Sequence, residues 1–365
     1  MSELGWTRRD AIRRHLGLWG SARTSELRAR FEVSERTIQR DFNAIVADSA
    51  DITRVHGGLV ASGDPDRARL RVGLLVPNPD YYFDDVLRGA QDTAERLNVR
   101  LVTAEHKYQD DLERLLLERL GEVRLDGLVV TVDHDEDRHR FLARQGLPTV
   151  IIERPWCPEL RNVDHVAGVG GYLDHVFSDH VAGAALGLQH LVDLEHRSIR
   201  CLFRNTPTTS ALARGVRDAA DHLIALGVTV ETWLLPMGAQ RRDETWCTAI
   251  DEVVSACLSD GVTAVMAHSD PVAEDLVDRL RAAGLAVPDR VSVVTYDGSR
   301  TATELGLSAV SPRRRAVGAV AVERIVDRLR QGGRRGSTGQ PGFRISLVPE
   351  FVAGRTTGPA PGFMA

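Results

Sequence analysis

The chain has 365 residues, of which 43% are hydrophobic and 27% charged, and its formal net charge is −5. This length favours two or three domains over one core, and the composition is that of a soluble globular protein. No apolar run approaches the ~18 residues that a membrane span needs, and the N-terminus has no apolar signal-peptide core, so we expect a cytoplasmic protein with no membrane partner. The cysteines show no CxxC spacing, which argues against a zinc site or a disulfide framework.

The first 60 residues contain two short helical patterns separated by a tight break. The first covers residues 25–31, and the second begins at Ser34, whose hydroxyl can cap a free backbone N–H of the first helical turn. Ile38, Phe42 and Ile45 follow at the i, i+4, i+7 spacing of a buried stripe. The outward positions are Arg36, Thr37, Gln39, Arg40 and Asn43. Cations and amides on one exposed face suit phosphates and base edges, so we interpret this pair as a helix-turn-helix, the alternative being a surface helix with solvated charges.

Residues 52–60 alternate in polarity and turn on two glycines, which predicts a small β-wing. The sequence VSERTIQRDF at 33–42, followed by RVHGG at 54–58, closely resembles the DeoR-type winged helix-turn-helix, and the resemblance covers residues 6–60. It implies operator DNA as a partner. We therefore expect residues 1–60 to form a DNA-binding domain with the following contact residues: Ser34, Arg36, Thr37, Gln39, Arg40, Asn43, Arg54 and His56.

Charge is distributed unevenly along the chain. Residues 1–60 carry a net charge of +2, and the remainder carries −7. This asymmetry fits a small basic DNA reader attached to a large acidic body.

Beyond the DNA-binding domain, residues 61–70 hold Gly, Pro and charges without an apolar period, which predicts a linker. From residue 71, strand-like runs alternate with amphipathic helices in two series, which predicts an α/β fold of two lobes, each a doubly wound parallel sheet. We expect the first lobe at 71–173 and 307–335, the second at 174–306 and 340–352, and a disordered tail at 358–365.

Ligands bind such sheets beyond the carboxyl ends of the strands. The strand-end segments, among them 153–154, 179–180, 204–206, 269–270 and 297–298, are rich in acids and amides, and aromatic residues follow the first strand. Acids accept paired hydroxyls and rings cover apolar C–H faces, which suits a polyhydroxylated ligand. From the pattern alone, each of these residues is better explained as a helix cap or a loop residue than as a ligand contact, and the assignment to a ligand site gains support only where a family motif matches.

Residues 70–357 resemble the effector-binding domain of the LacI/GalR regulators, which has a periplasmic-binding-protein-like fold. The matching stretches include RVGLLVPNPDYYFDDVLRGA, SDHVAGAALGLQHL, AHSDPVAEDLVDRL and VVTYDG. The resemblance implies a domain at 71–357 that forms homodimers and binds a small effector, a carbohydrate, between its lobes, with Asp297 and Asp270 on opposite walls. The expected ligand-binding residues are Asn78, Tyr82, Phe83, Glu153, Asp179, Arg204, Asp270 and Asp297.

Three departures from that family stand out. Leu212 occupies the position of an arginine that grips the ligand, and Arg214, about 200° round the helix, is expected to point elsewhere. Two alternatives follow: the ligand presents an apolar edge to Leu212, or Arg204 supplies the missing charge. Glu195 replaces a glycine that would tolerate left-handed φ, at a strain of ~1 kcal/mol. The hinge helix of the LacI headpiece is absent, and the wing and polar linker replace it.

These features predict a one-component transcription regulator, a repressor in the commoner family behaviour. No nucleophile elbow, kinase signature or catalytic triad occurs, so we expect no enzymatic activity, no metal site and no cofactor. Two alternatives belong to other classes. A sugar-binding transport component is disfavoured by the fused DNA reader, and an α/β enzyme acting on a sugar would be tested by a turnover screen.

Overall fold

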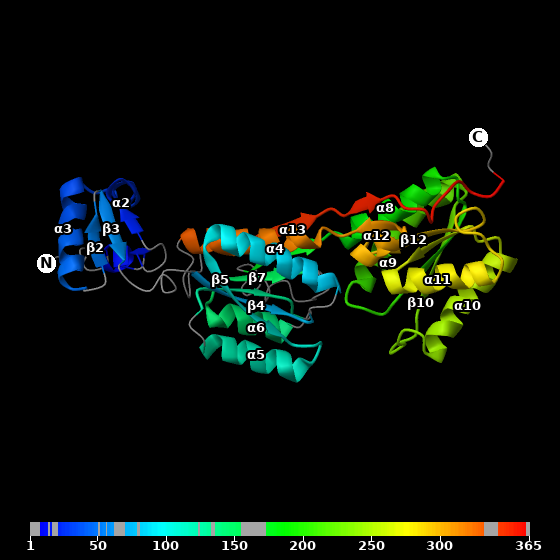
Figure 1. The fold of residues 1–365 in the computed structure, drawn as a ribbon, viewed down its shortest axis with the longest axis horizontal. Helices are drawn as coiled ribbons and strands as arrows, with labels where there is room; N and C mark the ends of the chain where they lie inside the picture. Colours follow the sequence, from blue (N-terminus) through cyan, green and yellow to red (C-terminus); the bar gives the residue numbers. More distant parts are fainter. Residues whose placement is uncertain are drawn as a thin grey trace.

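The computed structural model describes residues 8–13, 15–16, 21–49, 52–55, 57–61, 70–78, 81–122, 125–132, 136–154, 173–331 and 342–362. Figure 1 shows a small N-terminal domain followed by two larger lobes along the length of the molecule. None of the helices in these described ranges is long and apolar enough to cross a membrane.

The N-terminal domain is a winged helix. Residues 8–13 and 15–16 are helical, and they are followed by β1 (Ser21–Arg23), α2 (Thr24–Phe31), α3 (Glu35–Ala47), β2 (Ile52–Val55) and β3 (Gly58–Ala61). The strands form an antiparallel sheet in the order β1-β3-β2. The Ser34 side chain accepts the Thr37 N–H and caps α3, as the sequence predicted. Ile38, Phe42 and Ile45 are fully buried, which confirms the predicted stripe.

The first lobe is a parallel six-stranded sheet covered by helices on both faces. Its strand order is β14-β8-β7-β6-β4-β5, with β4 (Leu70–Val76), β5 (Val99–Glu105), β6 (Gly127–Val130), β7 (Thr149–Ile152), β8 (Asp174–Ser178) and β14 (Arg344–Leu347). In Figure 1, α4 (Tyr81–Leu97) and α13 (Arg314–Arg330) cover one face, and α5 (Asp110–Glu122) and α6 (Glu136–Gln145) cover the other. A Cβ at Gly89 or Gly318 would lie 1.9 Å from a backbone oxygen of the facing helix. Glycine therefore permits the close contact between α4 and α13.

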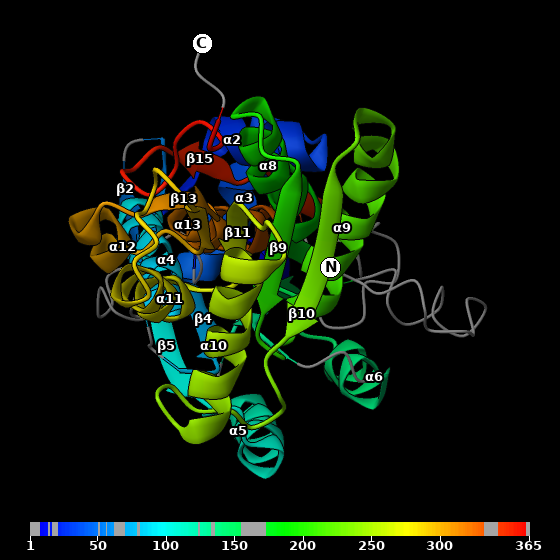
Figure 2. The ribbon, with the colours of Figure 1, turned by 90° about the vertical axis from the view of Figure 1, so that its right-hand side faces the viewer.

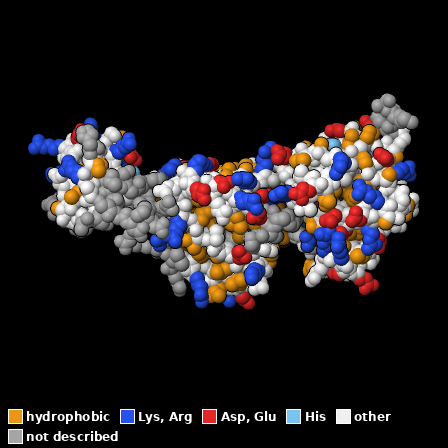
Figure 3. Space-filling model, viewed as in Figure 1, with side chains coloured by type: hydrophobic (Ala, Val, Ile, Leu, Met, Phe, Trp, Pro, Cys, Tyr) orange, Lys and Arg blue, Asp and Glu red, His pale blue; other side chains and the backbone are white. Residues whose placement is uncertain are grey.

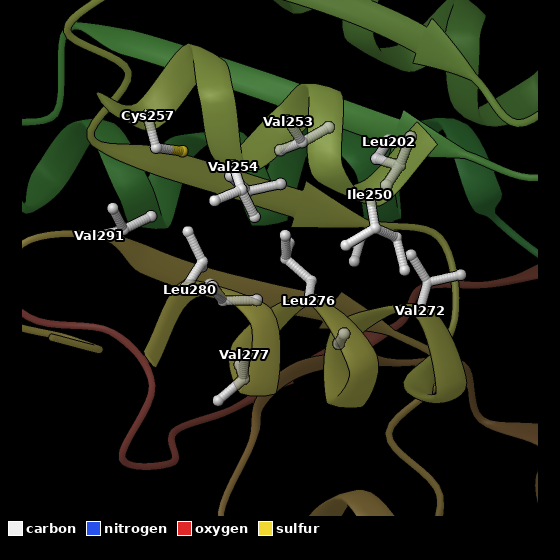
Figure 4. Packing of buried hydrophobic residues seen from close by; sticks show 14 of the residues in the cluster. Leu202, Ile250, Val253, Val254, Cys257, Val272, Leu276, Val277, Leu280 and Val291 are labelled. Atoms are coloured by element: carbon white, nitrogen blue, oxygen red, sulfur yellow. The ribbon is translucent and has the colours of Figure 1, made fainter. Parts of the chain in front are cut away.

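The second lobe repeats this arrangement. Its sheet order is β10-β9-β11-β12-β13-β15, with β9 (Ser198–Phe203), β10 (Thr229–Leu234), β11 (Ala264–Ala267), β12 (Ser292–Tyr296), β13 (Ser308–Ser311) and the antiparallel β15 (Glu350–Val352). Figure 2 shows α8 (His180–Asp193) and α9 (Thr209–Leu223) on one side of this sheet, and α10 (Glu244–Ser259) and α11 (Asp270–Ala282) on the other. A short 3-10 helix (Ile224–Leu226) follows α9, and α12 (Arg300–Leu305) follows β12. Ile250 and Val253 of α10 pack against Leu276 and Leu280 of α11 in the core drawn in Figure 4.

The lobe boundaries expected from the sequence are wrong at three strands. β8, expected in the second lobe, pairs with β7 in the first, and β14 joins the first sheet beside it. β13, expected in the first lobe, pairs with β12 in the second. The chain therefore crosses between the lobes after β8, after β13 and between β14 and β15. The lobe to which a strand belongs depends on the strand with which it forms hydrogen bonds. An apolar run in the sequence does not identify that partner strand.

The C-terminal segment also differs from expectation. Gly358 N donates to Ser292 Oγ at 3.0 Å, and Ala360 N donates to the Leu194 carbonyl at 2.8 Å. The prediction of disorder is therefore wrong for residues 358–362, and residues 363–365 lie outside the described ranges. Of the predicted linker, Ala61 ends β3 and Leu70 begins β4, and residues 62–69 lie outside the described ranges. Glu195 adopts a φ of 65°, as its position predicted.

Candidate ligand pocket and nucleic-acid interface

Helix α3 presents a polar face on the N-terminal domain. Arg36, Arg40 and Asn43 are exposed, and Thr37 and Gln39 are half-buried. Basic side chains project from this domain in Figure 3. This combination can reach both phosphates and base edges of DNA.

The wing is joined to this helix by an arginine. The guanidinium of the exposed Arg54 in β2 donates to Gln39 Oε1 and to Asn43 Oδ1. Three of the residues predicted to contact DNA are thus held together on one surface. His56 lies outside the described residues.

Two predicted DNA residues have partners within the domain. The Ser34 hydroxyl lies 2.9 Å from Thr37 Oγ1 and also caps the helix, so both groups have local partners.

Asp41, on the inner side of α3, is 3% exposed and accepts from Arg8 Nε at 2.6 Å. This ion pair fastens α3 to the helical residues 8–13.

A pocket of about 140 Å³ lies between the two lobes of the body. Its lining comes from both lobes and lies beyond the carboxyl ends of the parallel strands, as expected for this fold. The lining residues are Tyr82, Phe83, Tyr108, Glu153, Arg154, His180, Arg204, Thr206, Pro207, Thr208, His268, Ser269 and Asp297.

Glu153 is the central hydrogen-bond acceptor of the first-lobe wall. The residue is 1% exposed, and its Oε1 accepts from Tyr82 Oη at 3.0 Å and from Ser178 Oγ at 2.9 Å. Its Oε2 accepts from Ser178 N at 3.0 Å. Burial raises the pKa of Tyr82 well above its ordinary value, with Glu153 adding to the shift, so the phenol stays protonated and donates. Glu153 also has a φ of 52°, a backbone strain of the kind that gathers at binding sites.

His180 lies between Glu153 of the first-lobe wall and Tyr296 of the second lobe. Its Nδ1 lies 2.8 Å from Tyr296 Oη, and its Nε2 lies 3.8 Å from Glu153 Oε2. Burial lowers the pKa of His180 and outweighs the opposing effect of Glu153, so the imidazole is neutral at neutral pH. Its Nε2 has no hydrogen-bond partner in the described part of the chain.

The second-lobe wall is built on the loop after β9. Arg204 N donates to His268 Nδ1 at 3.1 Å, so the ring proton resides on Nε2, which lies 3.2 Å from Thr208 Oγ1. Burial, reinforced by Arg204, lowers the pKa of His268 to about 3, so this ring is also neutral. The half-buried Arg204 guanidinium lies 5.6 Å from the ring centre of Trp246. The loop is thus fixed by a neutral histidine and presents a cation to the pocket.

The loop that follows β12 carries Asp297 and contributes it to the pocket lining from the second lobe. Asp297 has a φ of 105°, and its carbonyl accepts from Arg314 Nη1. Arg314 also donates from Nε and Nη2 to Asp85 Oδ2 at 3.2 and 3.1 Å. Because Arg314 and Asp85 belong to first-lobe helices, this arginine ties the loop of one lobe to the other.

Five of the predicted ligand residues, Tyr82, Phe83, Glu153, Arg204 and Asp297, line the pocket.

The other three, Asn78, Asp179 and Asp270, do not line it. Asp179 accepts from Ala182 N at 2.9 Å and caps α8. Asp270 does not form an opposite wall. It lies behind the Asp297 loop and accepts from Thr295 Oγ1 at 2.9 Å, Gly298 N at 3.2 Å and Ser299 N at 2.7 Å.

The apolar-edge alternative for Leu212 is wrong. Leu212 is fully buried and packs with Ala184 and Leu188 in the second-lobe core, away from the pocket. Arg214 is exposed and does not line the pocket either, as its position on the helix predicted.

Eight lining residues were not predicted: Tyr108, Arg154, His180, Thr206, Pro207, Thr208, His268 and Ser269. Several lie in the correct strand-end segments, next to a predicted residue. Asp179 caps α8 and Asp270 accepts backbone N–H groups of the Asp297 loop, so neither carboxylate lines the pocket. The neighbouring residues, His180 and Ser269, line it instead. The aromatic ring of Tyr108 after a strand was the available signal for that residue. In the described part of the chain, no group of three His, Cys, Asp or Glu side chains is arranged to hold a metal ion.

Two segments of the chain match models of known domain families. Residues 8–63 match the model of the DeoR-like helix-turn-helix domain, and residues 188–357 match that of the periplasmic binding protein-like domain. The chain is 26% identical over 270 residues to the HTH-type transcriptional repressor PurR of Photobacterium profundum, which covers 71% of this chain and 74% of that protein. It is 26% identical over 363 residues to the HTH-type transcriptional regulator MalR of Streptomyces coelicolor, which covers 94% of this chain and 98% of that protein.

The fold is also found among solved structures. A LacI family transcriptional regulator from Enterococcus faecium with bound ribose superposes with a TM-score of 0.60 at 21% identity, over 79% of this chain and 99% of that chain. This likeness supports the two-lobed architecture described above.

Proposed function

We infer that this chain is a DNA-binding transcriptional regulator, in which a DeoR-like winged helix is joined to a LacI-type effector-binding body. This conclusion rests on the presence of two surfaces in the same chain, one suited to DNA and one suited to a small ligand. An exposed recognition helix is linked to its wing through Arg54, and a polar pocket lies between two lobes. A ligand that touches both lobes can change their relative arrangement and hence operator affinity.

The effector we propose is a sugar or a sugar derivative. The pocket combines the carboxylates of Glu153 and Asp297, which accept hydroxyls, with the rings of Tyr82 and Phe83, which cover C–H faces. A structural neighbour holds ribose, which agrees with this chemistry.

We further propose that the protein acts in the cytoplasm as a homodimer on a two-fold-related operator, whose half-site spacing would follow the protein symmetry. Effector binding closes the lobes and releases the operator, so that the protein acts as a repressor. Arg314 supports a coupled movement, because it contacts both the Asp297 carbonyl of one lobe and Asp85 of the other.

Operator binding is tested with Arg36→Ala and Arg40→Ala, using DNA selected from a random pool. Both residues are exposed on α3, so their loss should weaken operator binding while leaving folding and effector binding intact. An arginine that contacts only phosphate should lower the salt slope by ~0.9, uniformly across sequences. An arginine that reads a base should relax specificity at one position, by ~1–3 kcal/mol.

The matched control is Arg300→Ala. This arginine lies in the second lobe with its side chain 91% exposed, so its removal makes the same charge change far from the recognition helix. Wild-type operator affinity in both α3 variants would contradict the assignment. A turnover screen on sugars and sugar phosphates separates this function from that of an enzyme.

A further inference from the structure

We propose that the second-lobe wall of the pocket is an anion subsite, and that the effector is a polyhydroxylated molecule carrying a carboxylate or phosphate group. This inference rests on the proposed function and narrows its ligand class. The subsite consists of Arg204, Ser269 and the N-termini of α9 and α11, all of which belong to the second lobe.

Two long helices begin at the pocket without a side-chain cap. The N-cap residues Thr208 of α9 and Ser269 of α11 both line the pocket, and neither side chain accepts a hydrogen bond from its own first turn. The first turn of a helix carries a partial positive charge that attracts anions. In α9 the Thr209 and Ala211 N–H groups already donate to the Thr206 and Thr208 carbonyls, and Pro271 of α11 has no N–H, so these two helix ends act mainly through that partial charge. The N-caps of α8 and α10, Asp179 and Asp243, instead accept a backbone N–H from within their own helices.

A buried hydroxyl at the same wall has no partner. Ser269 is 2% exposed, and its Oγ forms no hydrogen bond within the described ranges of the chain. A buried polar group of this kind is costly unless a ligand or water satisfies it. Its place at the start of α11 makes it a donor to a group bound at that helix terminus.

Arg204 brings a positive charge to this wall. It lines the pocket and forms no ion pair with a carboxylate within the described ranges, although the Asp297 carboxylate lines the same pocket and the buried Asp270 begins α11. The neighbouring His268 contributes no charge, because burial holds its pKa at about 3. A planar guanidinium presents a fork of donors that fits a carboxylate or a phosphate.

The first-lobe wall carries charges of both signs, because the carboxylate of Glu153 and the guanidinium of the buried Arg154 line the pocket there. The Glu153 carboxylate already accepts from Tyr82 and Ser178, and His180 Nε2 next to it is unpartnered in the described part of the chain. Glu153 is therefore held as a fixed hydrogen-bonding group for neutral hydroxyls. A ligand that spans the pocket would place its hydroxyls against this wall and its anionic end against Arg204.

The test is isothermal titration calorimetry of the full chain with matched compounds. The first set is ribose, ribonate and ribose 5-phosphate, and the second is glucose, gluconate and glucose 6-phosphate. We expect an anionic member to bind about tenfold or more tightly than its neutral parent, as a charge-assisted hydrogen bond predicts. The carboxylate and phosphate members distinguish the two sources of the anion.

Variants assign the preference to this wall. Arg204→Gln should remove it, and Ser269→Ala should weaken binding of the anionic compound several-fold more than binding of its neutral parent. Arg214→Gln is the matched control, because this exposed arginine lies on α9 outside the pocket and its loss should change nothing. Arg204→Lys keeps the charge without the fork, and should retain a weaker preference if the glutamine variant proves unstable in thermal unfolding.

Three results would overturn the inference: no anionic compound binds, each binds no better than its neutral parent, or the preference persists in Arg204→Gln. These outcomes are separable from failure of the proposed function. A neutral sugar that binds and releases the selected operator would refute the anion subsite and leave the regulator intact. Absence of any sequence-specific DNA binding would refute the regulator itself.

Discussion

Asp270 provides a sharp test of how the pocket is built. Its carboxylate accepts three hydrogen bonds from Thr295 Oγ1, Gly298 N and Ser299 N, and the residue is 6% exposed. In Asp270→Asn, the amide oxygen can keep the two donors that share Oδ1. The amide nitrogen must then face the Ser299 N–H, which is 2.7 Å from Oδ2 in the wild type.

The magnitude follows from that one mismatch. Leaving a buried N–H opposed by another donor costs about 1–3 kcal/mol, and the lost acceptor was charged, which places the value at about 2–3 kcal/mol. Thermal unfolding should therefore shift down by several degrees. The loosened loop carries Asp297, so effector affinity should also fall even though Asp270 does not line the pocket.

Asp278→Asn is the matched control, because Asp278 lies exposed on the same helix and its substitution should change stability by less than about 0.5 kcal/mol. Urea unfolding of the two variants, followed by circular dichroism, measures the difference. If Asp270→Asn is as stable as the wild type while effector binding is lost, Asp270 contacts the ligand directly and the bracing role is refuted.

Two further predictions concern buried residues near the pocket. Leu212→Ala should reduce stability by about 2–5 kcal/mol, because it leaves a cavity in the second-lobe core. Leu212→Met should cost less than about 1.5 kcal/mol and keep wild-type effector affinity. Loss of the effector response in the methionine variant would show that this side chain contacts the ligand. For His268, burial lowers the folded-state pKa to about 3, while the unfolded imidazole takes up a proton below about 6.5. Stability should therefore fall as the pH drops from about 6.5 towards 3, by up to about 1.4 kcal/mol per unit from this group. Unfolding midpoints measured across that range should depend less on pH in His268→Gln, and an unchanged slope would show that the ring is not held neutral.

The sequence by itself determined the main helix of the N-terminal domain, whereas the strand β1 and its pairing with β3 were not predicted. Ser34 caps α3, and Ile38 and Phe42 form its buried stripe, because both features arise within one helix and follow its 3.6-residue period. The alternation of strands and helices likewise indicated two parallel sheets, since each βαβ unit is local in the chain. The left-handed backbone at Glu195 was also readable from its position after a helix.

Tertiary structure decided which strands share a sheet and which side chains face the pocket. β8 and β13 exchange lobes relative to expectation, because pairing depends on a neighbour that is distant in sequence or brought close by a crossover. Asp179 and Asp270 turn away from the pocket because nearby backbone N–H groups bind their carboxylates, which leaves His180 and Ser269 to line it. A residue type at a strand end predicts which chemistry is present there. Whether such a side chain faces the pocket depends on whether nearby backbone N–H groups bind it first, and only the folded structure shows which of the two occurs.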